Sequence, residues 1–158
     1  MKKIIKIVVV SFLLILFSGC TTSKSYTFSV STGDKVKISV ITNDGYDMTS
    51  STPFNVTKDD KTVSTGTFAT KEAYDYYKNA VNSDSSSKII DSGTKGDTNY
   101  FFYEHDGSTK EYNYIIQIEN SDTVVILGNT ESEESAKNVF ENLEISLEEK
   151  QWNQKKRY

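Results

Sequence analysis

"EYNYIIQIENSDTVVILGNTESEESAKNVFENL", residues 111–143, contains two strand patterns followed by one helix pattern. In the first part every second residue is apolar, a period that is typical of a half-buried strand; the apolar positions are Tyr112, Tyr114, Ile116 and Ile118. The run TVVILG, residues 123–128, is apolar on both faces. We expect such a strand at the centre of a sheet, where both faces are covered.

The end of this stretch has the spacing of an amphipathic helix. Its apolar residues recur at i, i+3, i+4 and i+7, and they are Ala136, Val139, Phe140 and Leu143. We expect this face to pack on the sheet that contains residues 124–127, with Phe140 well buried. Thr130 and Glu133 have the T-x-x-E spacing of a capping box, which predicts the start of the helix. The segment LEISLE, residues 143–148, predicts a short edge strand.

A second helix pattern lies in the middle of the chain. Ala73, Tyr77 and Val81 recur at every fourth position, which predicts one buried helix face. Thr70 is a suitable N-cap, and the polar residues 82–87 predict a loop after the helix. The other segments predict strands joined by turns, and they cover residues 26–30, 35–41, 54–57, 62–70, 88–93 and 99–105.

This order of elements predicts an α+β fold, mainly an antiparallel sheet with a mid-chain helix and a C-terminal helix packed on it. We assign residues 26–147 to a single domain and residues 148–158 to a polar tail. The closing pair, DTVVILGNTE leading into SEESAKNVFENLEIS, resembles the end of the PsbP-like α/β sandwich. The resemblance is one of element order over roughly Tyr26 to Leu147, and it implies a binding module whose partners vary.

The chain begins with the layout of a secretory signal. A basic segment with three lysines precedes an apolar run at residues 7–17, and the small residues Ser18 and Gly19 follow. The apolar run is shorter than the roughly 20 residues that a membrane-spanning helix needs. Residues 1–19 are therefore predicted to form a signal helix that is cleaved from the mature protein.

The segment FSGC, residues 17–20, resembles the lipobox of bacterial lipoproteins. The resemblance implies that the Cys20 thiol receives a diacylglyceryl group and that the bond between Gly19 and Cys20 is cut. Residues 20–25 would then be a lipidated tether on the extracytoplasmic face of the cell membrane, because two acyl chains anchor a protein stably. The alternative is an ordinary signal in which the cysteine has no such role.

Composition restricts the partners and the chemistry. Removal of residues 1–19, with their three lysines, changes the net charge from −4 to −7, which argues against nucleic acid as a partner. Cys20 is the only cysteine and His105 the only histidine, so neither a disulfide nor a His/Cys metal site is expected. No cofactor motif is present.

Catalytic motifs are weak. A Ser-His-Asp triad would have to use His105, which we interpret as an exposed turn residue, and no G-x-S-x-G elbow accompanies it. Ser85 and Lys88 have S-x-x-K spacing, but a serine-rich loop produces it by chance. The turn aspartates lack the EF-hand pattern. The 22 acidic residues offer many carboxylate pairs for a small envelope hydrolase, and none stands out.

Aromatic residues concentrate on two neighbouring predicted strands. A sheet face left open there would present tyrosines to a ligand or partner, and the candidate binding surface comprises Tyr100, Tyr103, Tyr112 and Tyr114. The alternative is that helices cover these rings as core. The sequence thus favours a small binding or envelope-interaction domain, with the carboxylate-pair hydrolase as the second hypothesis.

Overall fold

The computed structural model describes residues 21–148, and within them antiparallel sheets and two helices confirm the predicted α+β fold. The predictions for the signal at residues 1–19, for cleavage at Gly19 and for lipid attachment at Cys20 lie outside the described residues, as does most of the predicted tail at residues 148–158. No helix within residues 21–148 has the length and apolar character needed to cross a membrane.

The small sheet has three antiparallel strands in the order β1-β2-β10; they are β1 (Ser23–Ser29), β2 (Lys35–Ile41) and β10 (Leu143–Leu147). The period of two in β2 buries Val36, Ile38 and Val40 completely. Strand β10 is the edge strand predicted for LEISLE. Strand β1 begins at Ser23, so the segment predicted as a tether already enters the sheet three residues before Tyr26.

The large sheet has seven antiparallel strands in the order β3-β4-β5-β9-β8-β7-β6. Its strands are β3 (Tyr46–Met48), β4 (Phe54–Lys58), β5 (Lys61–Thr70), β6 (Ser87–Lys95), β7 (Thr98–Asp106), β8 (Lys110–Ile118) and β9 (Thr123–Asn129). Strand β9 is the fourth of the seven, which confirms the central position predicted from its two apolar faces.

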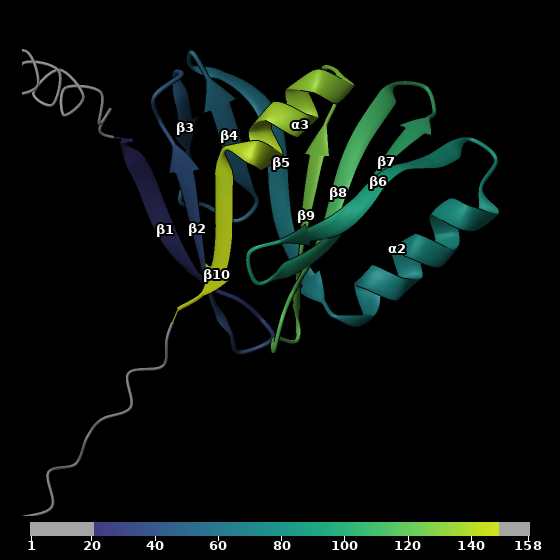
Figure 1. Ribbon diagram of the computed structural model, residues 1–158, viewed down its shortest axis with the longest axis horizontal. Coiled ribbons are helices and arrows are strands. Elements are labelled where there is room, and N and C mark those ends of the chain that lie inside the picture. The colour runs from purple at the N-terminus through teal and green to yellow at the C-terminus, as the bar shows by residue number, and fades with distance from the viewer. Residues whose placement is uncertain (1–20, 149–158) are drawn as a thin grey trace, which may run out of the picture.

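The main core lies between the two sheets, beneath helix α3 (Glu133–Glu141). Val36 and Ile38 of the small sheet belong to the same apolar cluster as Phe54 and Val125 of the large sheet. Helix α2 (Glu72–Ser83) packs on the opposite face of the large sheet, where Val81 joins a second, smaller cluster. Figure 1 shows the small sheet at the left, with β3 and β4 of the large sheet in the same part of the view, and α2 at the right beyond β6 to β9.

Helix α3 packs as predicted but starts at a different residue. Three of the four predicted residues, among them Phe140 at 4% exposure, are buried within the helix, and the fourth, Leu143, is buried at the start of β10. The capping box of Thr130 and Glu133 was wrong, because the N-cap is Ser132, whose Oγ accepts from the Ser135 amide at 3.0 Å.

The reason lies in the preceding strand. Strand β9 continues to Asn129, whose Oδ1 accepts hydrogen bonds from the amides of Glu131 and Ser132, at 2.8 and 3.3 Å. These bonds hold the chain in a turn, so the N-cap lies two residues after the position predicted at Thr130. The Asn129 amide group also donates to Ser64 and Ser135, at 3.1 and 3.0 Å, which satisfies a buried polar side chain.

Helix α2 also differs at both ends from its prediction. Its N-cap is Lys71 rather than Thr70, and no side chain caps it. The Lys71 amide donates to the Asp122 carbonyl at 2.9 Å, and its ammonium donates to the Asp122 carboxylate at 2.7 Å. This junction with the β8–β9 turn fixes where the helix begins. The helix continues to Ser83, two residues into the predicted loop.

Because every strand pair is antiparallel, the turns gather at two ends of the molecule. At the Thr22 end, Thr22 donates to Asn43 of the β2–β3 turn and Asp59 of the β4–β5 turn donates to Gly45. At the Asp34 end, the β1–β2, β5–α2, β6–β7 and β8–β9 connections come together. In Figure 1 strand β1 begins at the upper left, and the Asp34 end is at the bottom.

Candidate functional site

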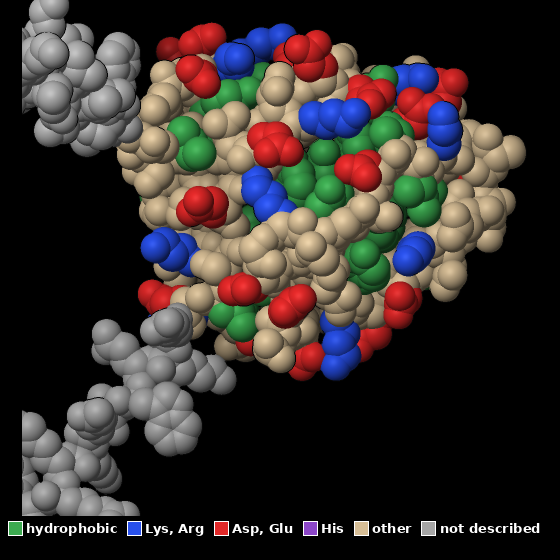
Figure 2. Space-filling model, in the orientation of Figure 1, with side chains coloured by type: hydrophobic (Ala, Val, Ile, Leu, Met, Phe, Trp, Pro, Cys, Tyr) green, Lys and Arg blue, Asp and Glu red, His purple; other side chains and the backbone are tan. Residues whose placement is uncertain are grey.

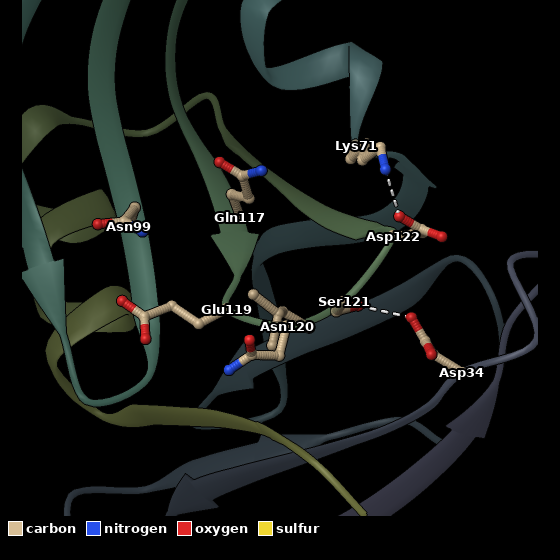
Figure 3. A pocket seen from close by; sticks show the side chains of 9 residues that line it. Asp34, Lys71, Asn99, Gln117, Glu119, Asn120, Ser121 and Asp122 are labelled. Atoms are coloured by element: carbon tan, nitrogen blue, oxygen red, sulfur yellow. Dashed lines mark hydrogen bonds and ion pairs between the residues drawn. The ribbon is translucent and has the colours of Figure 1, made fainter.

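A polar hollow of about 530 Å³ lies at the Asp34 end, between the β8–β9 turn and the start of α2 (Figure 3). It is lined by Asp34, Lys71, Asn99, Gln117, Ile118, Glu119, Asn120, Ser121 and Asp122. Asn99 on β7 and Gln117 on β8 are directly opposite each other in the strand register. Four segments that are distant in the sequence therefore contribute side chains to one concave surface.

Part of the lining is fixed by hydrogen bonds. The Asp34 Oδ2 accepts from the Ser121 hydroxyl at 2.6 Å and from the Thr123 hydroxyl at 2.9 Å, which ties the β1–β2 turn to the β8–β9 turn. Lys71 is paired with Asp122, and their hydrogen bond raises the pKa of the Lys71 ammonium. The one cation of the lining is thus already neutralised by a carboxylate.

Four lining side chains remain uncommitted. Within residues 21–148, Asn99, Gln117, Glu119 and Asn120 form no side-chain hydrogen bond or ion pair. In Figure 3 no dashed line reaches any of them; Asn99, Gln117 and Glu119 lie apart from the two bonded pairs, and Asn120 lies beside Ser121. Each amide offers two donor hydrogens and an acceptor oxygen, and the carboxylate offers acceptors only. The hollow therefore presents unused hydrogen-bonding groups and little apolar surface.

A second hollow of about 820 Å³ adjoins the first and shares Ile118, Glu119 and Asn120 with it. Its other wall comes from the small sheet, where Thr27, Lys37 and Ser146 stand side by side in the register of β1, β2 and β10. The β8–β9 turn thus separates the polar hollow from a second one of mixed lining, and Asn120 belongs to both. Asn120 has a positive φ of 56°, a conformation that asparagine tolerates better than most residues.

The four tyrosines of the predicted binding surface do not form one surface. Tyr103 is buried on the α2 side of the sheet, whereas Tyr100, Tyr112 and Tyr114 lie on the α3 side. Tyr114 is 3% exposed, because its ring stacks on Phe140 with ring centroids 4.1 Å apart. Tyr100 and Tyr112 are half-buried. Neighbouring positions of a strand point to opposite faces, and both faces are covered here.

The pKa values of these tyrosines agree with burial. Burial raises the pKa of Tyr103 to about 12, and it also raises the pKa of Tyr114. The Tyr100 hydroxyl donates to Asp91 at 3.1 Å. Figure 2 shows hydrophobic side chains in several separate places on this face, the most extensive near its centre, among Lys, Asp and Glu side chains. Tyr103 and Tyr114 are therefore core, as the alternative prediction has it, and the four tyrosines are not brought together on one face.

His105 has serine and aspartate neighbours, but they do not form a catalytic triad. Its Nδ1 lies 3.0 Å from the Ser87 hydroxyl and 3.3 Å from the Asp84 carboxylate. A triad needs the carboxylate on one ring nitrogen and the nucleophile on the other, whereas here both contact the same nitrogen. Hydrogen bonds from Ser86 and Ser87 lower the pKa of Asp84 to about 2. The cluster closes the α2–β6 loop.

The polar hollow was not predicted from the sequence. Residues 119–122 join two strands, and nothing in their local sequence marks them as part of a site. The signal is the approach of four connections in space, and it appears only once the strands are paired. Among the described residues, no group of three or more His, Cys, Asp or Glu side chains is arranged to hold a metal ion.

The resemblance to the PsbP-like sandwich stays a prediction, since it rests on element order alone. No family model, curated protein or solved structure matches this chain.

Proposed function

We propose that this chain is a bacterial lipoprotein, anchored through Cys20 on the extracytoplasmic face of the cell membrane, whose domain binds a hydrophilic ligand at the polar hollow. The location rests on FSGC, residues 17–20, directly after a basic and an apolar segment. The binding role rests on one observation, the four uncommitted polar side chains around a hollow of about 530 Å³.

The lining favours a neutral ligand rich in hydroxyl or amide groups. Amide side chains both donate and accept, so they match groups that also do both. An anion is disfavoured because the hollow carries three carboxylates and its lysine is already paired with Asp122. An apolar ligand would leave the amides of Asn99 and Gln117 without hydrogen bonds, which costs about 1–3 kcal/mol for each buried group.

The hydrolase hypothesis gains no specific support. A general acid needs a raised carboxyl pKa, whereas the pKa is lowered at four carboxyl groups of the domain, Asp47, Glu72, Asp84 and Glu131. In the hollow, Asp34 accepts two hydroxyl hydrogen bonds and Asp122 is paired with Lys71. Two of the three carboxylates in the hollow are thus engaged in holding turns, and Glu119 is the one left uncommitted.

The anchor is tested by metabolic labelling with an alkyne fatty acid, followed by membrane fractionation. The wild-type protein should carry the label and stay with the membrane, and Cys20→Ala should lose the label. Thr21→Ala is the matched control, since it changes the neighbouring residue and keeps the thiol. Equal labelling of wild type and Cys20→Ala would contradict the proposed lipid attachment.

The hollow is tested by NMR titration of the protein with a neutral N-acetylglucosamine tetramer, which carries hydroxyl and acetamide groups. Shift changes should concentrate at Asn99, Gln117 and Asn120, and the double variant Gln117→Ala/Asn120→Ala should weaken binding at least tenfold. Thr65→Ala, at an exposed position on β5, should bind like wild type. Saturable binding elsewhere, or none at millimolar tetramer, would refute this ligand class.

A further inference from the structure

We infer that the lipid anchor holds this domain with its Thr22 end against the bilayer, so that the polar hollow faces away from the membrane and receives a water-soluble ligand. The inference rests on the proposed function in one respect, the attachment of lipid at residue 20. It adds the orientation of the domain, which side meets the lipid headgroups, and the side from which a ligand arrives.

The first step is the length of the tether. Thr22 is already part of the folded domain, because its amide donates to Asn43 Oδ1 at 2.9 Å and its carbonyl accepts from the Thr42 amide at 2.9 Å. The Thr22 hydroxyl also bonds to Asn43, at 2.8 Å. Only Thr21 separates this residue from Cys20. Two residue steps span at most about 7 Å, so the Thr22 end stays next to the headgroups.

The second step is the direction of the strands. Strand β1 starts at Ser23 and runs away from the anchor toward the β1–β2 turn, which contains Asp34. Its seven residues span about 23 Å, at roughly 3.3 Å per residue. The polar hollow lies at that far end, where Ser121 bonds to Asp34. The anchor and the hollow are therefore at opposite ends of the molecule.

The net charge of the protein decides whether the domain stands upright on the bilayer or lies on its side. Residues 20–158 carry a net charge of −7, and an anionic bilayer repels such a body within a Debye length of about 8–10 Å. The outer face of the small sheet offers no compensating attraction, since Lys35 pairs with Glu148 and Lys37 shares that face with Glu144. A domain that meets the bilayer only with its Thr22 end keeps most of its charge farther from the surface than one Debye length.

The orientation is tested on vesicles of phosphatidylethanolamine and phosphatidylglycerol. Residues 20–158 with Cys20→Ser are coupled to a diacyl lipid through the oxidised N-terminal serine, so the anchor does not depend on lipidation in cells. The chain then has no cysteine, and a single one is introduced for a fluorophore at Asp44→Cys, Lys37→Cys or Ser31→Cys. A nitroxide on the lipid headgroup is the quencher.

Quenching should be at least threefold stronger at position 44, near the Thr22 end, than at position 31, in the β1–β2 turn, with position 37 also weak. Insertion of ten Gly and Ser residues between Thr21 and Thr22 should lower quenching at position 44 toward the value at position 31. Strong quenching at positions 31 and 37 would mean that the domain lies flat and would overturn the inference. If the wild-type protein carried no fatty-acid label in cells, the proposed lipid attachment would be refuted. The orientation measured on vesicles would be unaffected, because there the lipid is attached chemically.

Discussion

Gly66 on β5 has no side chain at a point where another residue occupies the space. It is paired with Phe54 of β4, whose ring lies across it: a Cβ added at Gly66 would come within 2.0 Å of the Phe54 Cζ. Phe54 is fully buried and contacts the rings of Phe28 and Phe68, with centroids 5.5 and 5.8 Å away. The glycine thus allows an aromatic side chain to fill the core between the sheets.

Gly66→Ala should therefore destabilise the domain by about 1–3 kcal/mol, the usual cost of overpacking a core. Thr65→Ala is the control, since Thr65 is exposed and the neighbouring position faces away from Phe54. Urea unfolding of both variants measures the difference in the free energy of unfolding. A Gly66→Ala protein as stable as the control would show that Phe54 does not occupy this position.

Asp84 predicts a local response to acid. Its Oδ1 accepts from the Ser86 amide at 3.0 Å, and the hydroxyl of Ser86 contributes most to the lowered pKa, about 2 against an ordinary 3.8. A lowered folded-state pKa means that this stabilisation is present above pH 3.8 and is lost as the pH falls toward 2. The α2–β6 loop should therefore open before the sheets unfold.

Hydrogen exchange checks this directly. The protection factor of the Ser86 amide should fall between pH 4 and pH 2 in the wild type. In Asp84→Asn the side-chain oxygen still accepts a hydrogen bond but does not titrate, so protection should not vary over that interval. The same pH dependence in both proteins would exclude Asp84 as the titrating group.

Lys95 connects the β6–β7 hairpin to the end of α3. Its ammonium donates to the carbonyls of Phe140, Glu141 and Leu143, at 2.6, 2.9 and 2.9 Å. Carbonyls at a helix C-terminus lack partners within the helix and carry partial negative charge, so a cation there is favourable. Lys95 therefore fixes the point where α3 ends and β10 begins, and joins both to the large sheet.

Helix α3 supplies the clearest stability prediction. Phe140 is 4% exposed and stacks on Tyr114, so Phe140→Ala should lower the free energy of unfolding by about 3–5 kcal/mol. Asn138 is exposed on the outer side of the helix, so Asn138→Ala should change it little. Denaturant unfolding measures both. Equal, small effects would mean that α3 is not docked on the sheet.

Elements were predicted from the sequence better than their ends. The period of two and the apolar run identified β8 and the central β9 because burial of one face or both is a regular property of a strand. The start of α3 was missed because it depends on where β9 ends, at Asn129, whose side chain holds the next turn. The start of α2 likewise depends on a long-range contact between Lys71 and Asp122.

The candidate site is built from segments that are distant in the sequence, and this explains why the sequence did not reveal it. Asn99 and Gln117 meet through the pairing of β7 with β8. Asp34 comes from the β1–β2 turn and Lys71 from the connection between β5 and α2. The tyrosines are a different case, because both covering helices were predicted from the sequence. The structure buries Tyr103 and Tyr114, as the core alternative expected.

The two sheets should fold as one unit, because Val36 and Ile38 of the small sheet share an apolar cluster with Phe54 and Val125 of the large sheet. Neither sheet has a separate core on this face, so loss of one exposes the other. We therefore expect residues 21–148 to unfold in a single cooperative transition, with the same midpoint by far-ultraviolet circular dichroism and by tyrosine fluorescence.

A shorter chain, residues 26–147, should also fold alone but with a lower midpoint. It lacks the hydrogen bonds of Thr22 with Asn43 and the ion pair between Lys24 and Asp47, at 2.6 Å. It also loses the first three residues of β1, which pair with β2 from Ser39 to Ile41. A chelator should leave both midpoints unchanged, because packing rather than metal holds the sheets. A clear drop on adding chelator, or two separate transitions, would refute this account of the fold.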